Sequence, residues 1–181
     1  MMYNHKSNAG NTADVWKHSI LLQVVNALRP EAYFETHCGY PYYNKGKMLF
    51  SSFMKVRMQH ECRMTLCDTN KNIGCHIPVG MDMRFLHVDG WSQIQKPSGH
   101  DLYFVDPPYD SMTDLVMLEA LLDDPTFLKP LIAWYPMFRD THPVNYDFGL
   151  PKIECTFNEG KLIGCGMVFK NVPDHIVKGI Q

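Results

Sequence analysis

The chain has 181 residues, 45% of them hydrophobic, and a net charge of −2 at pH 7. This length and composition are typical of one globular domain with a full hydrophobic core. The sequence contains neither an apolar run long enough for a transmembrane helix nor an apolar N-terminal signal core. We therefore expect a cytoplasmic protein with no membrane partner. The modest negative charge argues against a strongly basic nucleic-acid binder.

Two residue classes give weaker signals. The six cysteines have no C-x-x-C pair and no spacing typical of a disulfide framework or a zinc site, so we expect reduced thiols and no bound metal. Lys and Arg residues cluster between positions 45 and 71. That cluster would form either a solvated helix face or a patch that contacts phosphates.

Hydrophobic periodicity and the positions of Pro and Gly predict helices that alternate with strands. In chain order they are a helix over 12–28, a strand over 33–36, helices over 47–59 and 69–76 with a strand over 64–67 between them, strands over 85–88 and 102–105, a helix over 112–122, a strand over 131–135, and a hairpin of strands 153–157 and 162–169. Pro30 ends the first helix, and we expect Pro136 to stop the strand before it. The order predicts an α/β fold: a mostly parallel sheet with helices on both faces and an antiparallel C-terminal hairpin.

In an open α/β sheet, ligands bind outside the carboxyl ends of the strands. His37 and Gly39 follow the first predicted strand, where a small residue lets the backbone approach a ligand. Asp68 ends the second strand and would either accept hydrogen bonds from a ribose diol or cap the next helix. Asp89 and Gly90 follow the third strand, where Asp89 would either reach an adenine amino group or occupy a turn. Because no loop for a triphosphate is present, S-adenosylmethionine fits this set better than a nucleotide.

The segment Asp106-Pro107-Pro108-Tyr109 directly follows the apolar run 102–105. Two prolines make it a rigid polar lip that can be neither helix nor central strand, although Pro and Asp are also common at ordinary strand exits. Methylation of an exocyclic amine requires such a lip. A carboxylate and a backbone carbonyl accept the two amine hydrogens, and an aromatic ring stacks on the base.

The first eighteen residues are rich in side chains capable of chemistry. Asn11 or Thr12 would cap the helix over 12–28, which is a structural role. A structural role explains His5, Lys17 and His18 less well, so we expect these three residues to serve function.

Six segments, in this order, resemble the RlmJ family of 23S ribosomal RNA adenine-N6 methyltransferases. They are Tyr-x-His-x-x-x-Ala-Gly-Asn-x-Ala-Asp-Val-x-Lys-His at 3–18, Thr-His-x-Gly at 36–39, Asp-Gly-Trp at 89–91, Val-Asp-Pro-Pro-Tyr-Asp at 105–110, Trp-Tyr-Pro at 134–136 and Cys-Gly-Met-Val at 165–168. The first of them is the most specific because it is long and rare. The resemblance extends from Tyr3 to about Pro173.

The resemblance implies one Rossmann-like, class I methyltransferase domain over 1–181 that binds S-adenosylmethionine. The residues implied at the cofactor are His18, His37, Asp68, Asp89, Gly90 and Asp106, to which the glycine argument above adds Gly39. The segment from Asp106 to Tyr109 would hold the target adenine. Tyr3, His5 and Lys17, within the N-terminal segment 1–18, would lie over the active site near the substrate.

The sequence therefore predicts a methyltransferase that acts on the N6 amine of a flipped adenine, with ribosomal RNA as the favoured substrate. Two alternatives remain open. The same motif also serves DNA adenine-N6 or cytosine-N4 methyltransferases. Tyr40 and Pro41 stand where the family has Ala and Gly, and the family's helical insertion before the second strand is missing. The missing insertion and the modest net charge leave the DNA alternative open, whereas Tyr40 and Pro41 in the cofactor loop favour a non-catalytic cofactor-binding protein or a partner subunit.

Overall fold

The computed structural model describes residues 11–44, 48–96, 99–109, 111–138, 146–159 and 162–180. Its elements are α2 (Thr12–Leu28), β1 (Ala32–Glu35), β2 (Tyr42–Asn44), β3 (Met48–Phe50), α3 (Ser52–Gln59), β4 (Arg63–Asp68), the 3-10 helix η1 (Lys71–His76), β5 (Met83–His87), α4 (Gly90–Ile94), β6 (Leu102–Val105), α5 (Met112–Asp123), β7 (Leu131–Phe138), β8 (Lys152–Glu159), β9 (Leu162–Lys170) and α6 (Asp174–Lys178). Among these described elements, no helix combines the length and apolar character needed to span a bilayer.

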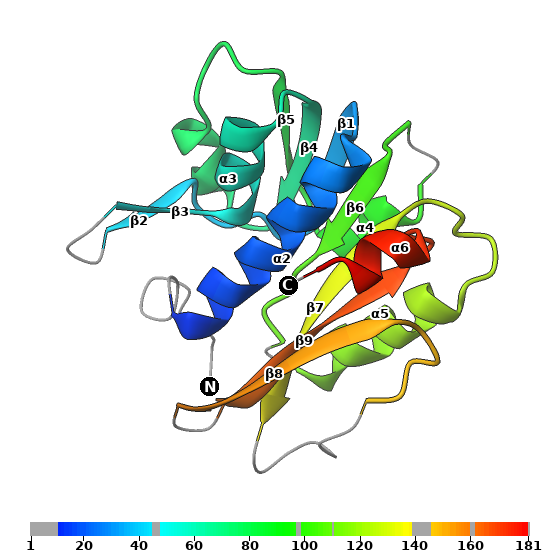
Figure 1. The fold of residues 1–181 in the computed structure, drawn as a ribbon. Helices are drawn as coiled ribbons and strands as arrows, with labels where there is room; N and C mark the ends of the chain where they lie inside the picture. The colour runs from blue at the N-terminus through cyan, green and yellow to red at the C-terminus, as the bar shows by residue number, and fades with distance from the viewer. Residues whose placement is uncertain are drawn as a thin grey trace.

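Seven strands form one twisted sheet in the order β5-β4-β1-β6-β7-β9-β8 (Figure 1). The strands from β5 to β7 in this order are parallel, whereas β9 runs antiparallel to both β7 and β8. The predicted α/β architecture, with its C-terminal antiparallel hairpin, is confirmed. The strand order changes direction at β1, so the loops that follow β1 and β6 lie at the point where such sheets bind ligands.

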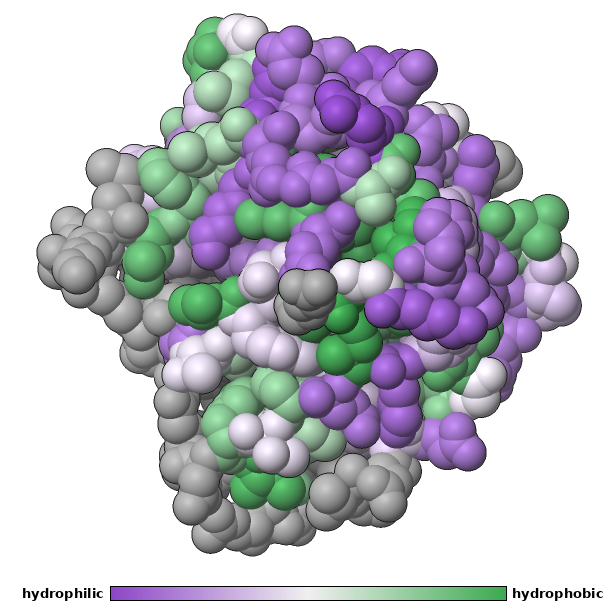
Figure 2. All heavy atoms as spheres, in the orientation of Figure 1, coloured by the Kyte–Doolittle hydropathy of each residue, from purple (hydrophilic) through white to green (hydrophobic). Residues whose placement is uncertain are grey.

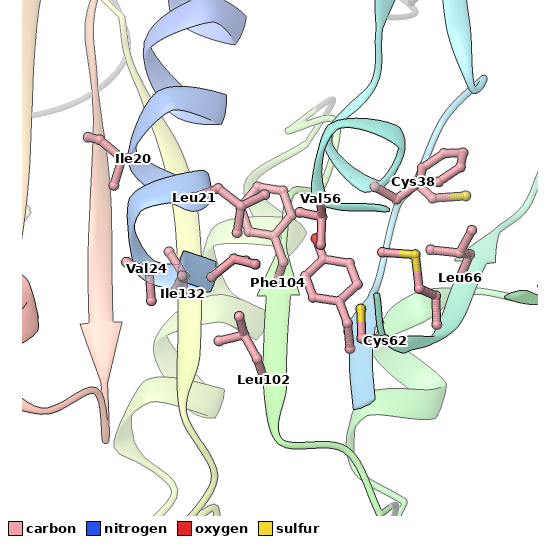
Figure 3. Close-up of a cluster of buried hydrophobic side chains, with 14 of the residues drawn as sticks. Ile20, Leu21, Val24, Cys38, Val56, Cys62, Leu66, Leu102, Phe104 and Ile132 are labelled. Atoms are coloured by element: carbon pink, nitrogen blue, oxygen red, sulfur yellow. The ribbon is translucent and has the colours of Figure 1, made fainter. Parts of the chain in front are cut away.

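Helices cover both faces of the sheet because successive residues of its buried strands point to opposite sides. Tyr33 packs in one apolar cluster with α2 and α3, whereas its neighbour Phe34 packs in the other with α4 and α5. Figure 3 shows the first cluster, in which Leu21 of α2 and Phe104 of β6 are buried together. Figure 2 shows that hydrophilic side chains cover much of the face on which α2 and α6 lie, with smaller apolar areas between them.

The predicted helix over 47–59 is wrong in its first part. Residues Tyr42–Asn44 and Met48–Phe50 pair as an antiparallel hairpin, and the helix α3 begins only at Ser52. The apolar run of Met48, Leu49 and Phe50 fits helix and strand alike, because a run this short has no diagnostic period. The hairpin is therefore the element that lies between the first loop and α3 in this chain.

The prediction that Pro136 stops β7 is also wrong, since the strand continues to Phe138. Tyr103 donates its backbone N–H to the Pro130 carbonyl, so the backbone groups of residues 130, 132, 134 and 136 face the β6 side. Pairing with β6 ends at Ala133. The missing N–H of Pro136 therefore falls beyond the end of β6, while pairing with β9 continues.

Candidate active site

The polar residues predicted at strand ends do lie along the carboxyl edge of the parallel strands. Thr36 continues β1 by donating its N–H to the Phe104 carbonyl at 3.1 Å, and its Oγ1 accepts the N–H of Asp106 at 3.4 Å. The N–H of Cys38 bonds to the Cys67 carbonyl at 3.0 Å. The loop after β1 is thereby joined to the ends of both neighbouring strands.

The centre of the site is an ion pair between Lys17 and Asp106. Lys17 Nζ lies 2.6 Å from Asp106 Oδ2 and 3.0 Å from Asp14 Oδ1. It also lies 4.9 Å from the centre of the Trp134 ring, within cation–π range. Burial alone would lower the pKa of Lys17, but the carboxylates of Asp106 and Asp14 outweigh it and raise the pKa well above its usual value. The cation is therefore fixed beside the first residue of the predicted amine-binding lip.

α2 positions this lysine. Asn11 caps the helix by accepting the N–H of Asp14 on its Oδ1 at 2.9 Å, as one of the two capping predictions had it. Lys17 and the neighbouring His18 are both buried one turn into the helix. The predicted functional residues Tyr3 and His5 precede this cap and lie outside the described residues.

His18 contacts a lysine from α3. Its Nδ1 lies 2.9 Å from Lys55 Nζ. Burial lowers the pKa of His18, and the charges of Lys17 and Lys55 lower it further, so His18 is neutral and accepts a hydrogen bond from Lys55. Arg57, another member of the basic cluster, lies 3.5 Å from Glu61 on its own helix. Two basic residues of that cluster thus have partners within the protein.

The loop at Gly39 and the carboxylate of Asp68 form one unit. Gly39 has a φ of 62°, which favours glycine, and donates its N–H to Asp68 Oδ2 at 3.0 Å. Asp68 Oδ1 accepts the N–H of Asn70 at 2.8 Å. The side chain that caps η1 is that of Asn70. The alternative role of Asp68 as a helix cap is therefore wrong, and its carboxylate instead holds the backbone N–H groups of Gly39 and Asn70.

Asp89 has a structural role that the sequence did not predict. Its Oδ1 accepts the N–H of Trp91 at 3.1 Å and so caps α4, a short helix where the sequence left a turn open as the alternative to an adenine contact. The same oxygen lies 3.8 Å from His37 Nε2, and about half of the Asp89 side chain is exposed. A Cβ at Gly90 would lie only 2.1 Å from the Thr36 carbonyl oxygen. Gly90 is thus required for the close packing of α4 against the loop after β1.

The rigid lip carries its tyrosine in an unusual conformation. Pro107 is buried and Pro108 is exposed. Tyr109 has a φ of 52°, in the left-handed region, and donates its hydroxyl to the Trp134 carbonyl. Its ring meets the Trp134 ring edge to face at 5.7 Å. Trp134 therefore contacts both Lys17 and Tyr109. We did not predict it as a site residue, although the Trp-Tyr-Pro segment was a signal that could have identified it.

A buried carboxyl group lies beneath this site. Glu35 ends β1, is fully buried, and accepts hydrogen bonds from Tyr33 Oη at 2.7 Å and from the hydroxyl of Ser52. Burial raises its pKa to about 8, although the two hydroxyl donors work against the shift. Glu35 joins the end of β1 to the beginning of α3.

Replacing Glu35 with Gln should flatten the dependence of stability on pH. The folded state keeps the Glu35 proton up to about pH 8, whereas the unfolded chain releases it near 4.5. Between these values the free energy of unfolding therefore falls by about 1.4 kcal/mol per pH unit, and above them it is constant. Urea unfolding of both proteins at several pH values measures this slope. The exposed Glu31 is the control: Glu31→Gln should retain the wild-type slope of unfolding free energy against pH. Parallel profiles for wild type and Glu35→Gln would contradict the assignment.

Three predicted groups are thus brought into contact: Lys17 with Asp106, Gly39 with Asp68, and His37 with Asp89. Among the described residues, no group of three His, Cys, Asp or Glu side chains is arranged to hold a metal ion.

No protein-family model and no curated protein matches this sequence. Solved structures match its fold. A putative methylase from Haemophilus influenzae aligns with a TM-score of 0.58 and 11% identity, covering 90% of this chain and 100% of that chain. The N-methyltransferase NodS from Bradyrhizobium japonicum, solved with S-adenosyl-L-homocysteine, aligns with a TM-score of 0.59 and 11% identity, covering 89% and 88%.

An rRNA methylase from Streptococcus thermophilus aligns with a TM-score of 0.54 and 8% identity, covering 91% of this chain and 100% of that chain. These likenesses extend over nearly the whole chain, so the fold is the Rossmann-like class I methyltransferase fold.

Proposed function

We propose that the chain is an S-adenosylmethionine-dependent methyltransferase that modifies the N6 amine of adenine in nucleic acid, with ribosomal RNA as the favoured substrate. The observation that carries this proposal is the Asp106 carboxylate at the end of β6, fixed by Lys17 and followed by the rigid segment 107–109. It lies on the edge of the sheet where this fold binds its ligands.

The residues present fit the cofactor. Asp68 holds its carboxylate at the end of β4 by accepting two backbone N–H groups, and a carboxylate has further lone pairs for the hydroxyls of a ribose. Gly39 gives the loop beside it a surface without a side chain. Asp89, half exposed, would accept from the adenine amine, with His37 beside it. When bound, S-adenosylmethionine supplies an electrophilic methyl group.

The chain itself would position the acceptor. The adenine amine is a poor nucleophile because its lone pair is conjugated into the ring. Asp106 and the Pro107 carbonyl would accept the two amine hydrogens and favour the reactive geometry, and Tyr109 would stack on the base. Positioning of this kind can supply roughly 7–11 kcal/mol in the best cases. The incoming amine would compete with Lys17 for the Asp106 carboxylate. Lys17 would keep Asp14 as a partner while the amine is bound.

Two observations favour RNA over DNA as the substrate. The N-terminal segment resembles the RlmJ family of ribosomal RNA methyltransferases, and an rRNA methylase is among the structures with this fold. The motif at 106–109 serves DNA amino methyltransferases equally well, so DNA is the alternative substrate. The loop with Tyr40 and Pro41 is the feature that favours a non-catalytic cofactor-binding protein or partner subunit.

Calorimetry with S-adenosyl-L-homocysteine tests the cofactor site first. Wild type should bind it, and Asp68→Asn should bind it about 10- to 100-fold more weakly, because a charged hydrogen-bond acceptor is lost. The exposed Asp82, changed to Asn, is the matched control and should bind as wild type does. No binding by the wild-type protein would overturn the proposal.

Transfer of a labelled methyl group to unmodified ribosomal RNA or to unmethylated DNA then separates the candidate functions. Label on RNA that maps to N6 of adenine supports the proposal. Label on DNA alone would show that DNA is the substrate, while the proposed transfer of a methyl group to an amine would stand. Cofactor binding without label on either nucleic acid would favour the non-catalytic alternative.

A further inference from the structure

Two cysteines face each other across the C-terminal hairpin. Cys155 of β8 and Cys165 of β9 are direct partners in the antiparallel register. Their Sγ atoms are 3.6 Å apart, within the distance of a weak S–H···S hydrogen bond in which either thiol can donate. Residues directly opposite in an antiparallel pair have Cα atoms about 4.5–5.5 Å apart, which lies within the range that a disulfide spans.

The two thiols differ in access. Cys165 is fully buried in the sheet, whereas Cys155 on the edge strand is partly exposed. β8 and β9 lie along one border of the molecule, with β8 outermost (Figure 1). A reagent in solution therefore reaches Cys155 first and Cys165 only through it.

The pair also lies close to the candidate active site. Cys165 is the register partner of Pro136, which lies two residues after Trp134 on β7. Burial raises the pKa of Cys165 to about 12, and the charge of Lys17 acts in the opposite direction. Trp134 is the residue whose ring lies beneath Lys17 and whose carbonyl binds the Tyr109 hydroxyl. Cys165 thus lies near Trp134, which contacts both Lys17 and Tyr109.

We propose that Cys155 and Cys165 are a modification site: they form a reversible disulfide between β8 and β9 when the protein meets a low-molecular-weight disulfide. This inference is independent of the proposed function, because it rests on the two sulfur atoms and their register.

The reaction balances in two exchange steps. The Cys155 thiolate attacks one sulfur of the small disulfide and releases one small thiolate. The Cys165 thiolate then attacks the Cys155 sulfur, forms the protein disulfide and releases the second small thiolate. Two protein thiols lose two protons and two electrons, and the small disulfide takes up both and becomes two thiols.

The pKa values predict how the rate responds to pH. Burial raises the pKa of Cys155 above its usual value, while the hydrogen bond with Cys165 lowers it in part. Because the thiolate is the attacking form, oxidation should accelerate about tenfold for each pH unit while the pH is below this pKa.

Oxidised glutathione is the probe for the test. The reduced protein is incubated with it, remaining thiols are blocked with N-ethylmaleimide, and tryptic peptides are mapped by mass spectrometry. Lys161 lies between the two cysteines, so trypsin separates them and the disulfide must appear as two linked peptides. We expect these linked peptides without bound glutathione, and their loss after dithiothreitol.

Two variants make the result specific. Cys155→Ser should leave Cys165 reduced, because the entry point is gone. The exposed Cys75, changed to Ser, is the matched control and should give the same yield of linked peptides as wild type. Glutathione retained on Cys155 without a link to Cys165 would overturn the proposal. So would reduced Cys155 and Cys165 under conditions that modify Cys75.

Discussion

Replacing Asp106 with Asn should lower methyl transfer by about 10²- to 10³-fold, the cost typical of removing one preorganised group that stabilises a transition state. The amide keeps the shape of the carboxylate but presents an N–H₂ group where the amine needs an acceptor. The fold should persist, because Lys17 retains Asp14 at 3.0 Å as a partner. The measurement is transfer of labelled methyl groups under single-turnover conditions.

Two controls separate loss of chemistry from loss of structure. Asp106→Asn should show a near-native circular dichroism spectrum. Asp82→Asn, a change of the same type on the exposed surface, should transfer methyl groups normally. Methyl transfer by Asp106→Asn at the wild-type rate would contradict the proposal that Asp106 accepts a hydrogen of the target amine.

Replacing Lys17 with Met should have the largest effect on stability, a loss of about 3 kcal/mol in the free energy of unfolding. The ammonium group lies between two carboxylates that are themselves mostly buried, with 18% and 13% of the Asp14 and Asp106 side chains exposed. Methionine keeps the length and the apolar contacts of the lysine stem but leaves both acids without their cation. Methyl transfer should also fall, because Asp106 loses the group that holds it in place.

Urea unfolding of a double-mutant cycle checks this explanation. If the ion pair is the cause, adding Asp106→Asn to Lys17→Met should recover part of the lost stability, since one of the two acids that have lost the lysine is removed. If the changes in unfolding free energy of the two single variants simply add in the double variant, Lys17 and Asp106 are not coupled. A loss below about 0.5 kcal/mol for Lys17→Met alone, the range of ordinary surface changes, would contradict the prediction outright.

Most of the sheet could be predicted from the sequence because each buried strand is a short apolar run with a polar boundary. β6 has the predicted bounds of 102–105, since Asp101 precedes the run and Asp106 and Pro107 follow it. The hairpin before α3 could not be predicted in the same way. Its strands have three residues each, which is too short for a period of two to be distinguished from a helical turn.

The candidate site was predicted as a set of residues but not as a set of contacts. Strand-end logic placed Asp68, Asp89 and Asp106 on one edge, because parallel strands bring their carboxyl ends together. The bond between Lys17 and Asp106 spans 89 positions of sequence, and no local pattern encodes a partner at that separation. The capping role of Asp89 and the contacts of Trp134 likewise depend on how α4 and β7 pack.

Pro136 has a consequence for how molecules of this protein meet one another. Beyond Ala133, β7 extends past its pairing with β6, and the edge of a strand can recruit a strand from another molecule and begin aggregation. On this edge Pro136 offers no N–H for an incoming strand, and the neighbouring Trp134 carbonyl is already taken by the Tyr109 hydroxyl. Neither an N–H at position 136 nor the Trp134 carbonyl is therefore available to hydrogen-bond with a foreign strand. The tyrosine to which we assign the base thus also occupies a backbone group through which a foreign strand would pair with β7.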